Sequence, residues 1–283
     1  MGVAQKLSSI PELIKLENTL FVLPFTYIGM LLAGIPSLAQ FLLITIALVC
    51  ARGAAFAVNR LAGHGIDMNN PKKRNWSSVR LYAKRDMALI AALFVAVFMA
   101  CAFMLNALAF VLAPIIVILL VLEPYTKRYT QHRHFTMGLI IGLGIFGGYI
   151  GMAGSFPTQL PIYVLLAGYA LFSGANDIIY TLNHVQHDIE NRLKTYPSRY
   201  GIATASIVSE QAHYSAALMF VLFGYMLGSA LVVMGAFLAF ILLFMEHRRL
   251  SRRDENSVRV SFFNYNVAVS LAMLLFVILS RLI

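Results

Sequence analysis

Charged residues are scarce in this chain of 283 residues. Asp, Glu, Lys and Arg together make up 12% of the sequence, whereas 60% is hydrophobic and the mean hydropathy is +0.77. Water-soluble domains carry about 25% charged residues, so this class is excluded. Intrinsic disorder is excluded as well, because disordered chains have low hydrophobicity. The composition therefore predicts an integral membrane protein.

Cysteine is also scarce, since the chain contains only Cys50 and Cys101. Both lie inside apolar runs, so we expect small core residues rather than parts of a disulfide or zinc framework. The apolar runs reach the ~20 residues that a spanning helix needs. They are much longer than the ~10-residue alternating segments of a transmembrane barrel. The spanning elements are therefore predicted to be helices.

The apolar runs between charged loops predict an all-α, polytopic membrane protein with nine transmembrane helices. Nothing resembles a soluble domain or a long linker, so residues 1–283 are expected to form a single integral membrane domain. The nine candidate spans are Asn18–Ile35, Leu38–Val58, Met87–Leu105, Leu108–Leu122, Phe135–Ala153, Pro161–Leu182, Ala212–Gly228, Ala230–Met245 and Phe262–Ile283.

The positive charges follow the expected topology. All of the 22 Lys and Arg residues except Arg52 and Arg281 lie in five segments that alternate with four others along the chain. The positive-inside rule places these five segments, with the N-terminus and all the long loops, in the cytoplasm. Because the bases follow membrane topology, the pI of 9.8 does not indicate binding to nucleic acid. The opposite loop Gly154–Gln159 carries no charge, so polar chemistry is expected on the cytoplasmic side.

Two of the predicted helices, the second and the sixth, end in polar residues. After the second, Asn59, Gly63 and Asp67 are spaced i, i+4 and i+8, which places them on one helix face. After the sixth, His184 and Asp188 are spaced i and i+4. Because these ends come four spans apart, we expect two four-helix pseudo-repeats plus a ninth helix. If these two polar helix faces meet, they would form a site for a divalent cation and an anionic ligand.

Asp177 lies inside the sixth apolar span, about two turns before His184, and Tyr180 lies between them. Ionisable residues at membrane depth are costly and usually functional, so Asp177 is a candidate catalytic residue. The alternative is an internal ion pair with Arg52, the other charge within a span.

Besides the polar ends of the second and sixth predicted helices, several short motifs resemble those of a known family. They are Ala51–Arg60, Asn70-Pro71, Tyr125-Thr126-Lys127-Arg128, Asp177-Ile-Ile-Tyr180, Tyr196–Gly201 and Phe262–Asn266. In this order they resemble the UbiA superfamily of intramembrane prenyltransferases, nearest the branch that prenylates 4-hydroxybenzoate and related quinone precursors. That superfamily has nine helices, an NxxxDxxxD motif after helix two and a DxxxD motif after helix six. The matches run through almost the whole chain.

Three positions depart from the family pattern. Gly63 and His184 stand where the family has aspartates, and Trp76 stands where an arginine is expected after Asn75. In ordinary members the Asp and Asn side chains hold Mg²⁺, which bridges to the diphosphate of an allylic isoprenoid. Mg²⁺ prefers oxygen ligands in near-octahedral geometry, so the loss of two carboxylates should weaken its binding.

The resemblance implies a role for each candidate site residue. The metal ligands are Asn59, Asp67, His184 and Asp188, with Mg²⁺ expected from the family and Mn²⁺ or Zn²⁺ as alternatives because of the imidazole. The diphosphate-binding residues are Asn59, Arg60, Lys127, Arg128 and Arg199. The catalytic residues are Asp67, Asp177 and Asp188, and Arg52 and Tyr180 belong to the acceptor pocket. The alternatives are helix-end residues in solvated loops for the polar groups, topological charge for the bases, and an inert substitution for His184.

The expected function is transfer of a polyprenyl group from a prenyl diphosphate to an aromatic or quinone-precursor acceptor within the lipid bilayer. Two alternatives stay open. One is a divergent member with other isoprenoid chemistry, such as terpene cyclisation or a transfer with little metal dependence. The other is a non-catalytic membrane protein that binds isoprenoids or quinones. A transporter is less well supported, because no matching pair of Gly/Pro-interrupted spans is visible.

Overall fold

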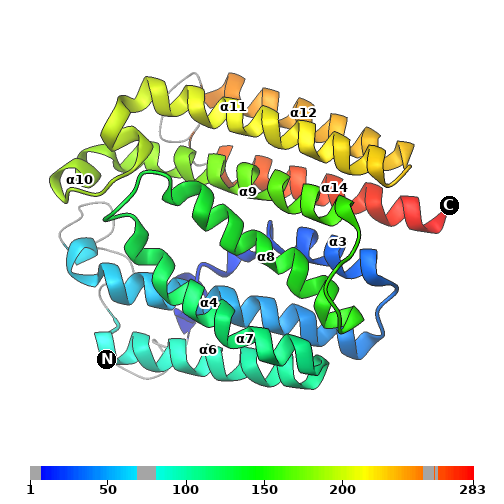
Figure 1. Cartoon of the computed structure of the whole chain (residues 1–283). Helices are drawn as coiled ribbons and strands as arrows, with labels where there is room; N and C mark the ends of the chain where they lie inside the picture. The colour runs from blue at the N-terminus through cyan, green and yellow to red at the C-terminus, as the bar shows by residue number, and fades with distance from the viewer. Residues whose placement is uncertain (1–7, 69–80, 251–257, 259–260) are drawn as a thin grey trace. The chain divides into compact units, whose positions relative to one another are not determined.

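The computed structural model describes residues 8–68, 81–250, 258 and 261–283, and every regular element in these residues is helical (Figure 1). The elements in chain order are α2 (Ile10–Leu13), η1 (Leu16–Thr19), α3 (Leu23–Ala33), α4 (Leu38–Met68), α6 (Lys84–Leu105), α7 (Ala107–Thr126), α8 (Arg133–Ala153), α9 (Leu160–Thr181), η2 (Leu182–His184), α10 (Val185–Glu190), α11 (Tyr196–Met226), α12 (Ala230–Leu250), η3 (Ser261–Tyr265) and α14 (Asn266–Leu282).

Eight helical segments of the described chain are long and apolar enough to cross a membrane. They correspond to the first six predicted spans and the last two, with ends that differ by a few residues. Most of the seventh predicted span, Ala212–Gly228, lies in α11, a longer and more polar helix that ends at Met226 and is not one of the eight. The expected all-α membrane fold is therefore confirmed, and each of the predicted spans is helical.

The chain forms two compact units. Unit 1 consists of Met1–Leu20 and Pro36–Thr126, and unit 2 consists of Phe21–Ile35 and Lys127–Ile283. This division differs from one into four-helix repeats, because α3 packs against α8 and α14 in unit 2. The pseudo-repeat and the single domain stay predictions.

Unit 1 is built on α4, which packs against α6 and α7. Near the start of α6, Leu13, Tyr82 and Met87 form a buried apolar cluster against which Phe56 of α4 packs. The first turn of α6 is closed by Asp86, whose carboxylate accepts the backbone N–H of Ala83 at 3.0 Å. This contact satisfies one of the polar groups that flank the start of a helix.

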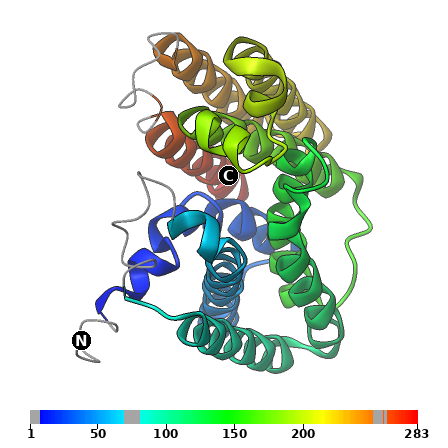
Figure 2. The same ribbon diagram turned by 90° about the vertical axis from the view of Figure 1, so that its left-hand side faces the viewer.

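In the described part of unit 2, six long helices form a ring. The packing order is α3, α8, α9, α11, α12 and α14, and α14 returns to α3 (Figures 1 and 2). An aromatic cluster from three of these helices fills the core. Phe25 of α3 lies 4.7 Å from Tyr169 of α9 and 5.5 Å from Phe220 of α11, measured between ring centroids. Phe172 of α9 completes the cluster at 6.2 Å from Phe220.

Glycines on α8 allow its two neighbours in the ring to approach closely. A Cβ at Gly148 would lie 2.2 Å from the carbonyl oxygen of Thr26 on α3. On the other side, a Cβ at Gly138 would lie 2.3 Å from the carbonyl oxygen of Ala170 on α9. Helices in a bilayer associate through such close packing, because lipid tails are as apolar as the side chains that they would replace.

We expect Gly138→Ala to destabilise the protein, because its methyl group would overlap a backbone carbonyl that cannot move away alone. Overpacking of this kind costs about 2 kcal/mol, so the melting temperature in detergent should fall by several degrees. Gly147→Ala is the matched control on the same helix, since a Cβ there meets nothing within 4 Å. Equal melting temperatures for the two variants would contradict the close contact between α8 and α9.

Candidate functional site

Asp177 is engaged by two basic side chains of α8. Its Oδ2 accepts a hydrogen bond from Nη2 of Arg133 at 2.6 Å and lies 2.6 Å from Nδ1 of His134. The Asp177 and Arg133 side chains are nearly buried, and His134 is fully buried. The two basic residues begin α8, whereas Asp177 lies one turn before the end of α9. The close contact at Gly138, one turn after His134, holds these helix ends together.

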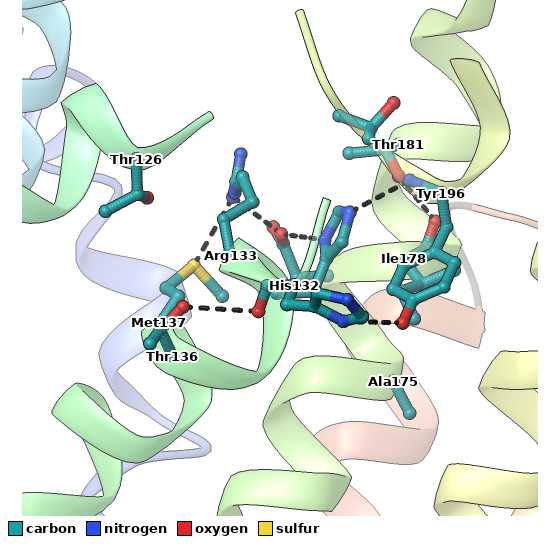
Figure 3. A network of polar contacts seen from close by, with 12 residues as sticks. Thr126, His132, Arg133, Thr136, Met137, Ala175, Ile178, Thr181 and Tyr196 are labelled. Atoms are coloured by element: carbon teal, nitrogen blue, oxygen red, sulfur yellow. Dashed lines mark hydrogen bonds and ion pairs between the residues drawn. The ribbon is translucent and has the colours of Figure 1, made fainter. Parts of the chain in front are cut away.

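His134 also joins this ion pair to the start of α11. Its Nε2 accepts the backbone N–H of Tyr196, the first residue of that helix, at 3.4 Å. Because Nε2 accepts this hydrogen bond it carries no proton, so the ring proton lies on Nδ1 and forms the hydrogen bond to Asp177. The N–H of Tyr196 is one of the donors that a helix leaves without an intrahelical partner. The hydroxyl of Tyr196 in turn contacts Nδ1 of His132 at 3.1 Å (Figure 3).

Asp188 is anchored to the residue that caps α11. The side chain is 6% exposed, and its Oδ2 accepts a hydrogen bond from the hydroxyl of Thr195 at 3.1 Å. The same Thr195 oxygen accepts the backbone N–H of Ser198 at 3.3 Å, and the N–H of Thr195 donates to the Ser198 hydroxyl at 3.0 Å. This reciprocal cap stabilises the helix start. The Asp188 carboxylate is therefore held in a defined position.

The arrangement of His184 differs from the expectation. The i, i+4 spacing of His184 and Asp188 predicts that both lie on one face of a continuous helix. In the structure α9 ends at Thr181 and a 3-10 turn follows, so that His184 is the last residue of this turn and the N-cap of α10, with φ −121° and ψ 10°. The two residues therefore do not belong to one continuous α-helix that extends from α9. The ring of His184 lies beside that of Tyr180, at 5.1 Å between centroids.

In unit 1 the expected helical spacing is confirmed. Asn59, Gly63 and Asp67 all belong to α4, which continues to Met68, so their backbone positions share one face. Asn59 is exposed and Gly63 is buried, whereas the side chain of Asp67 lies outside the described residues.

Two further predicted site residues of unit 1 are arginines of α4. Arg60 is buried, with 9% exposure, and so is Arg52. The guanidinium of Arg52 lies 4.7 Å from the centre of the Phe56 ring, a favourable cation–π distance. Asn70, Pro71, Asn75 and Trp76, which carry other features of the sequence, lie outside the described residues.

The basic residues expected to bind diphosphate in unit 2 lie in the loop after α7 and in the first turn of α11. The carbonyl of Lys127 accepts the backbone N–H of Lys194 at 2.8 Å, and Nζ of Lys194 donates to the carbonyl of Tyr129 at 3.0 Å. Arg128 is exposed in the loop after α7, and Arg199 is exposed in the first turn of α11. Both arginines are therefore accessible to an anion from solution.

Sequence reasoning missed three residues of this network. Arg133 was interpreted only as topological charge, and His134 and Thr195 were not singled out. The structure pairs Asp177 with Arg133 and His134. The weak signal was an Arg-His pair at the start of the span that precedes the one containing Asp177. These partners lie 44 and 43 residues from Asp177, beyond the reach of a local pattern.

Comparisons with known proteins agree with the resemblance that the sequence motifs carry. The family model described as "UbiA prenyltransferase family" matches residues 22–268. A 4-hydroxybenzoate octaprenyltransferase from Neisseria meningitidis serogroup B is 27% identical over 219 residues, which cover 75% of this chain and 72% of the relative.

Solved structures share the fold. The apo structure of a UbiA homologue from Aeropyrum pernix K1 superposes with a TM-score of 0.83 and 25% identity, covering 94% of this chain and 98% of that one. A UbiA homologue from Archaeoglobus fulgidus bound to GPP and Mg²⁺ has a TM-score of 0.74 at 16% identity and covers 97% and 100%.

We expect Arg133→Met and Asp177→Asn to be coupled in stability. Removing one partner of a buried pair leaves the other charge without compensation, which costs about 3 kcal/mol. The double variant should be less destabilised than the sum of the two, by about 1–3 kcal/mol. Thermal unfolding in detergent measures this, with the exposed Arg281→Met as the control for loss of an arginine. Additive effects would show that the two side chains do not interact.

Proposed function

The chain belongs to the UbiA prenyltransferase family, and on this basis we propose that it transfers a polyprenyl group from its diphosphate to an aromatic quinone precursor within the bilayer. The observation that carries the proposal is the family match over residues 22–268, which includes both polar helix ends. The relative named as a 4-hydroxybenzoate octaprenyltransferase supports a benzoate-type acceptor. The solved relative that holds GPP and Mg²⁺ supports a prenyl diphosphate and a divalent cation as ligands.

We propose that Asn59, Asp67, His184 and Asp188 hold the cation. The donor set contains two carboxylates, one amide oxygen and one imidazole, which suits a divalent cation, whereas Gly63 supplies no donor. The Thr195 hydroxyl fixes the Asp188 carboxylate, as the partners of ligating carboxylates commonly do. When bound, the cation supplies Lewis-acid stabilisation of the leaving diphosphate.

The bases neutralise the rest of the diphosphate charge in this proposal. Lys127, Arg128 and Arg199, together with Arg60, donate charge-assisted hydrogen bonds to its oxygens. The connection between the loops of Lys127 and Lys194 keeps the first of these donors near the start of α11. Preorganised arginine and lysine donors stabilise the negative charge that develops on the diphosphate as the carbon–oxygen bond breaks.

The contacts of Asp177 favour a positioning role. Its Oδ2 already accepts from Arg133 and from His134, so this oxygen does not face a substrate alone. We propose that Asp177 holds these two basic side chains in place, while Tyr180 and Arg52 belong to the acceptor pocket. Asp177→Asn retains an acceptor oxygen, so it should keep more than about a tenth of the turnover, whereas loss of a general base costs ~100-fold or more.

We expect Asp188→Ala and Asp67→Ala each to lower turnover by about 100-fold or more, the size of effect seen when a catalytic electrostatic contact is removed. The assay follows pyrophosphate release from prenyl diphosphates by purified protein with 4-hydroxybenzoate and a divalent cation. The control is Glu190→Gln, which removes an exposed carboxylate from the helix that also carries Asp188, α10. Wild-type turnover in both Asp variants would contradict the metal mechanism. Isoprenoid binding by the wild type without pyrophosphate release under any condition would favour a binding protein.

The choice of metal tests the role of His184. Imidazole favours Mn²⁺ or Zn²⁺ over Mg²⁺, so activity titrated with each cation should show that preference. His184→Asp combined with Gly63→Asp would restore two carboxylates and should shift the preference back to Mg²⁺. An unchanged order of metals in the double variant would mean that His184 is not a ligand.

The chain is an integral multi-pass membrane protein, and we propose that its N-terminus and polar loops face the cytoplasm. Single cysteines in a background without Cys50 and Cys101 test the orientation. Ser155→Cys should react with an impermeant thiol reagent in intact cells. Arg192→Cys should react only after permeabilisation, and the reverse pattern would overturn the orientation.

A further inference from the structure

A second group of titratable side chains lies where α11 packs against α12, and none of them belongs to the site proposed above. His213 comes from α11, and Glu246 and His247 come from the end of α12 (Figures 1 and 2 show these two helices side by side). The exposed fractions are 0% for His213 and Glu246 and 9% for His247. Three polar groups are thus almost completely buried between α11 and α12.

The ligand atoms of the three residues converge on one point. Nδ1 of His213 lies 2.9 Å from Nε2 of His247 and 3.4 Å from Oε2 of Glu246. One oxygen and two nitrogens, one from each residue, all lie within 4.8 Å of one another. In a tetrahedral zinc site with bonds of about 2.0–2.1 Å, ligand atoms are about 3.3 Å apart. The two shorter separations lie on either side of that value.

The described residues provide little to compensate a negative charge on the Glu246 carboxylate. Neither of its oxygens has a hydrogen-bond partner among the described residues, and its one ion-pair contact there is the long one to His213. The nearby carboxylate of Glu210 accepts a hydrogen bond from the hydroxyl of Tyr214 at 2.7 Å. An isolated buried charge is strongly unfavourable, and more so within a bilayer. A hydrogen bond between the two imidazoles would not relieve it.

A cation at the point of convergence accounts for all three side chains. It would give the Glu246 carboxylate a positive partner and would use the lone pairs of two neutral imidazoles. Imidazole suits Zn²⁺ and related transition metals, whereas Mg²⁺ prefers oxygen ligands. Aromatic rings surround the cluster, with Phe172 centred 5.6 Å from His213 and Tyr214 centred 6.0 Å from His247. Such an apolar shell strengthens the attraction between ligands and cation.

We propose that His213, Glu246 and His247 bind a Zn²⁺ ion that links α11 to α12. This metal site is separate from the divalent cation proposed for the transfer reaction, and it does not depend on that reaction. The ligands come from both helices, so the ion closes one of the contacts of the six-helix ring of unit 2. Its main effect is on the stability of that contact.

Zinc content and thermal stability of the full chain test the proposal. All proteins carry His184→Ala, so that this imidazole contributes no zinc binding. After treatment with a chelator and reconstitution with Zn²⁺, the protein with an intact cluster should hold about one Zn²⁺ per chain and melt at a higher temperature than its apo form. Glu246→Gln and His213→Gln should bind Zn²⁺ at least about 10-fold more weakly. Glu190→Gln, which changes an exposed carboxylate, should behave like the protein with the intact cluster.

Equal zinc content in the intact and Glu246→Gln proteins, with no effect of Zn²⁺ on the melting temperature, would overturn the proposal. In that case the cluster would be a protonated, metal-free group. If the variants fail to fold, Co²⁺ titration of the protein with the intact cluster decides the question. The expected result is a visible absorption band that Zn²⁺ abolishes, and its absence would also overturn the metal site.

Discussion

The close approach of α8 to α9 is the contact on which the polar network of unit 2 depends. Within a bilayer, apolar side chains gain little by leaving lipid, so close packing between small residues must hold the helices together. Gly138 leaves room for the carbonyl of Ala170, and this brings the first turn of α8 against the last turn of α9. Arg133 and His134 thereby reach Asp177, a charge that would otherwise be costly at that depth.

From this contact a chain of hydrogen bonds extends to the start of α11. Asp177 orients His134, and His134 accepts the N–H of Tyr196. The neighbouring residue Thr195 caps the same helix and holds Asp188. Because buried polar groups are stable only when they are satisfied, these bonds specify one arrangement of the loop between α10 and α11. Groups that act on a diphosphate gain from such fixed placement, since no reorganisation is needed when charge develops.

Two departures from the family pattern bear on the proposed metal site. Gly63 supplies no oxygen donor on the face of α4, and His184, the last residue of the 3-10 turn after α9, would supply a nitrogen donor. This softer donor set would favour a different cation without a change of fold. The His213, Glu246 and His247 cluster lies between α11 and α12, so a metal bound there would also stabilise the contact between these helices.

The sequence alone determined the properties that depend on local pattern. Long apolar runs identify the spanning helices, the charge distribution predicts orientation, and the spacing of Asn59, Gly63 and Asp67 along α4 follows from the helical period. The order of the motifs identifies the family. Only the tertiary structure decided which distant residues meet: the Arg133 and His134 partners of Asp177, the anchoring of Asp188 by Thr195, and the meeting of His213 with Glu246. Such pairings depend on how closely helices pack and where a turn interrupts them, and neither leaves a periodic signal in the chain.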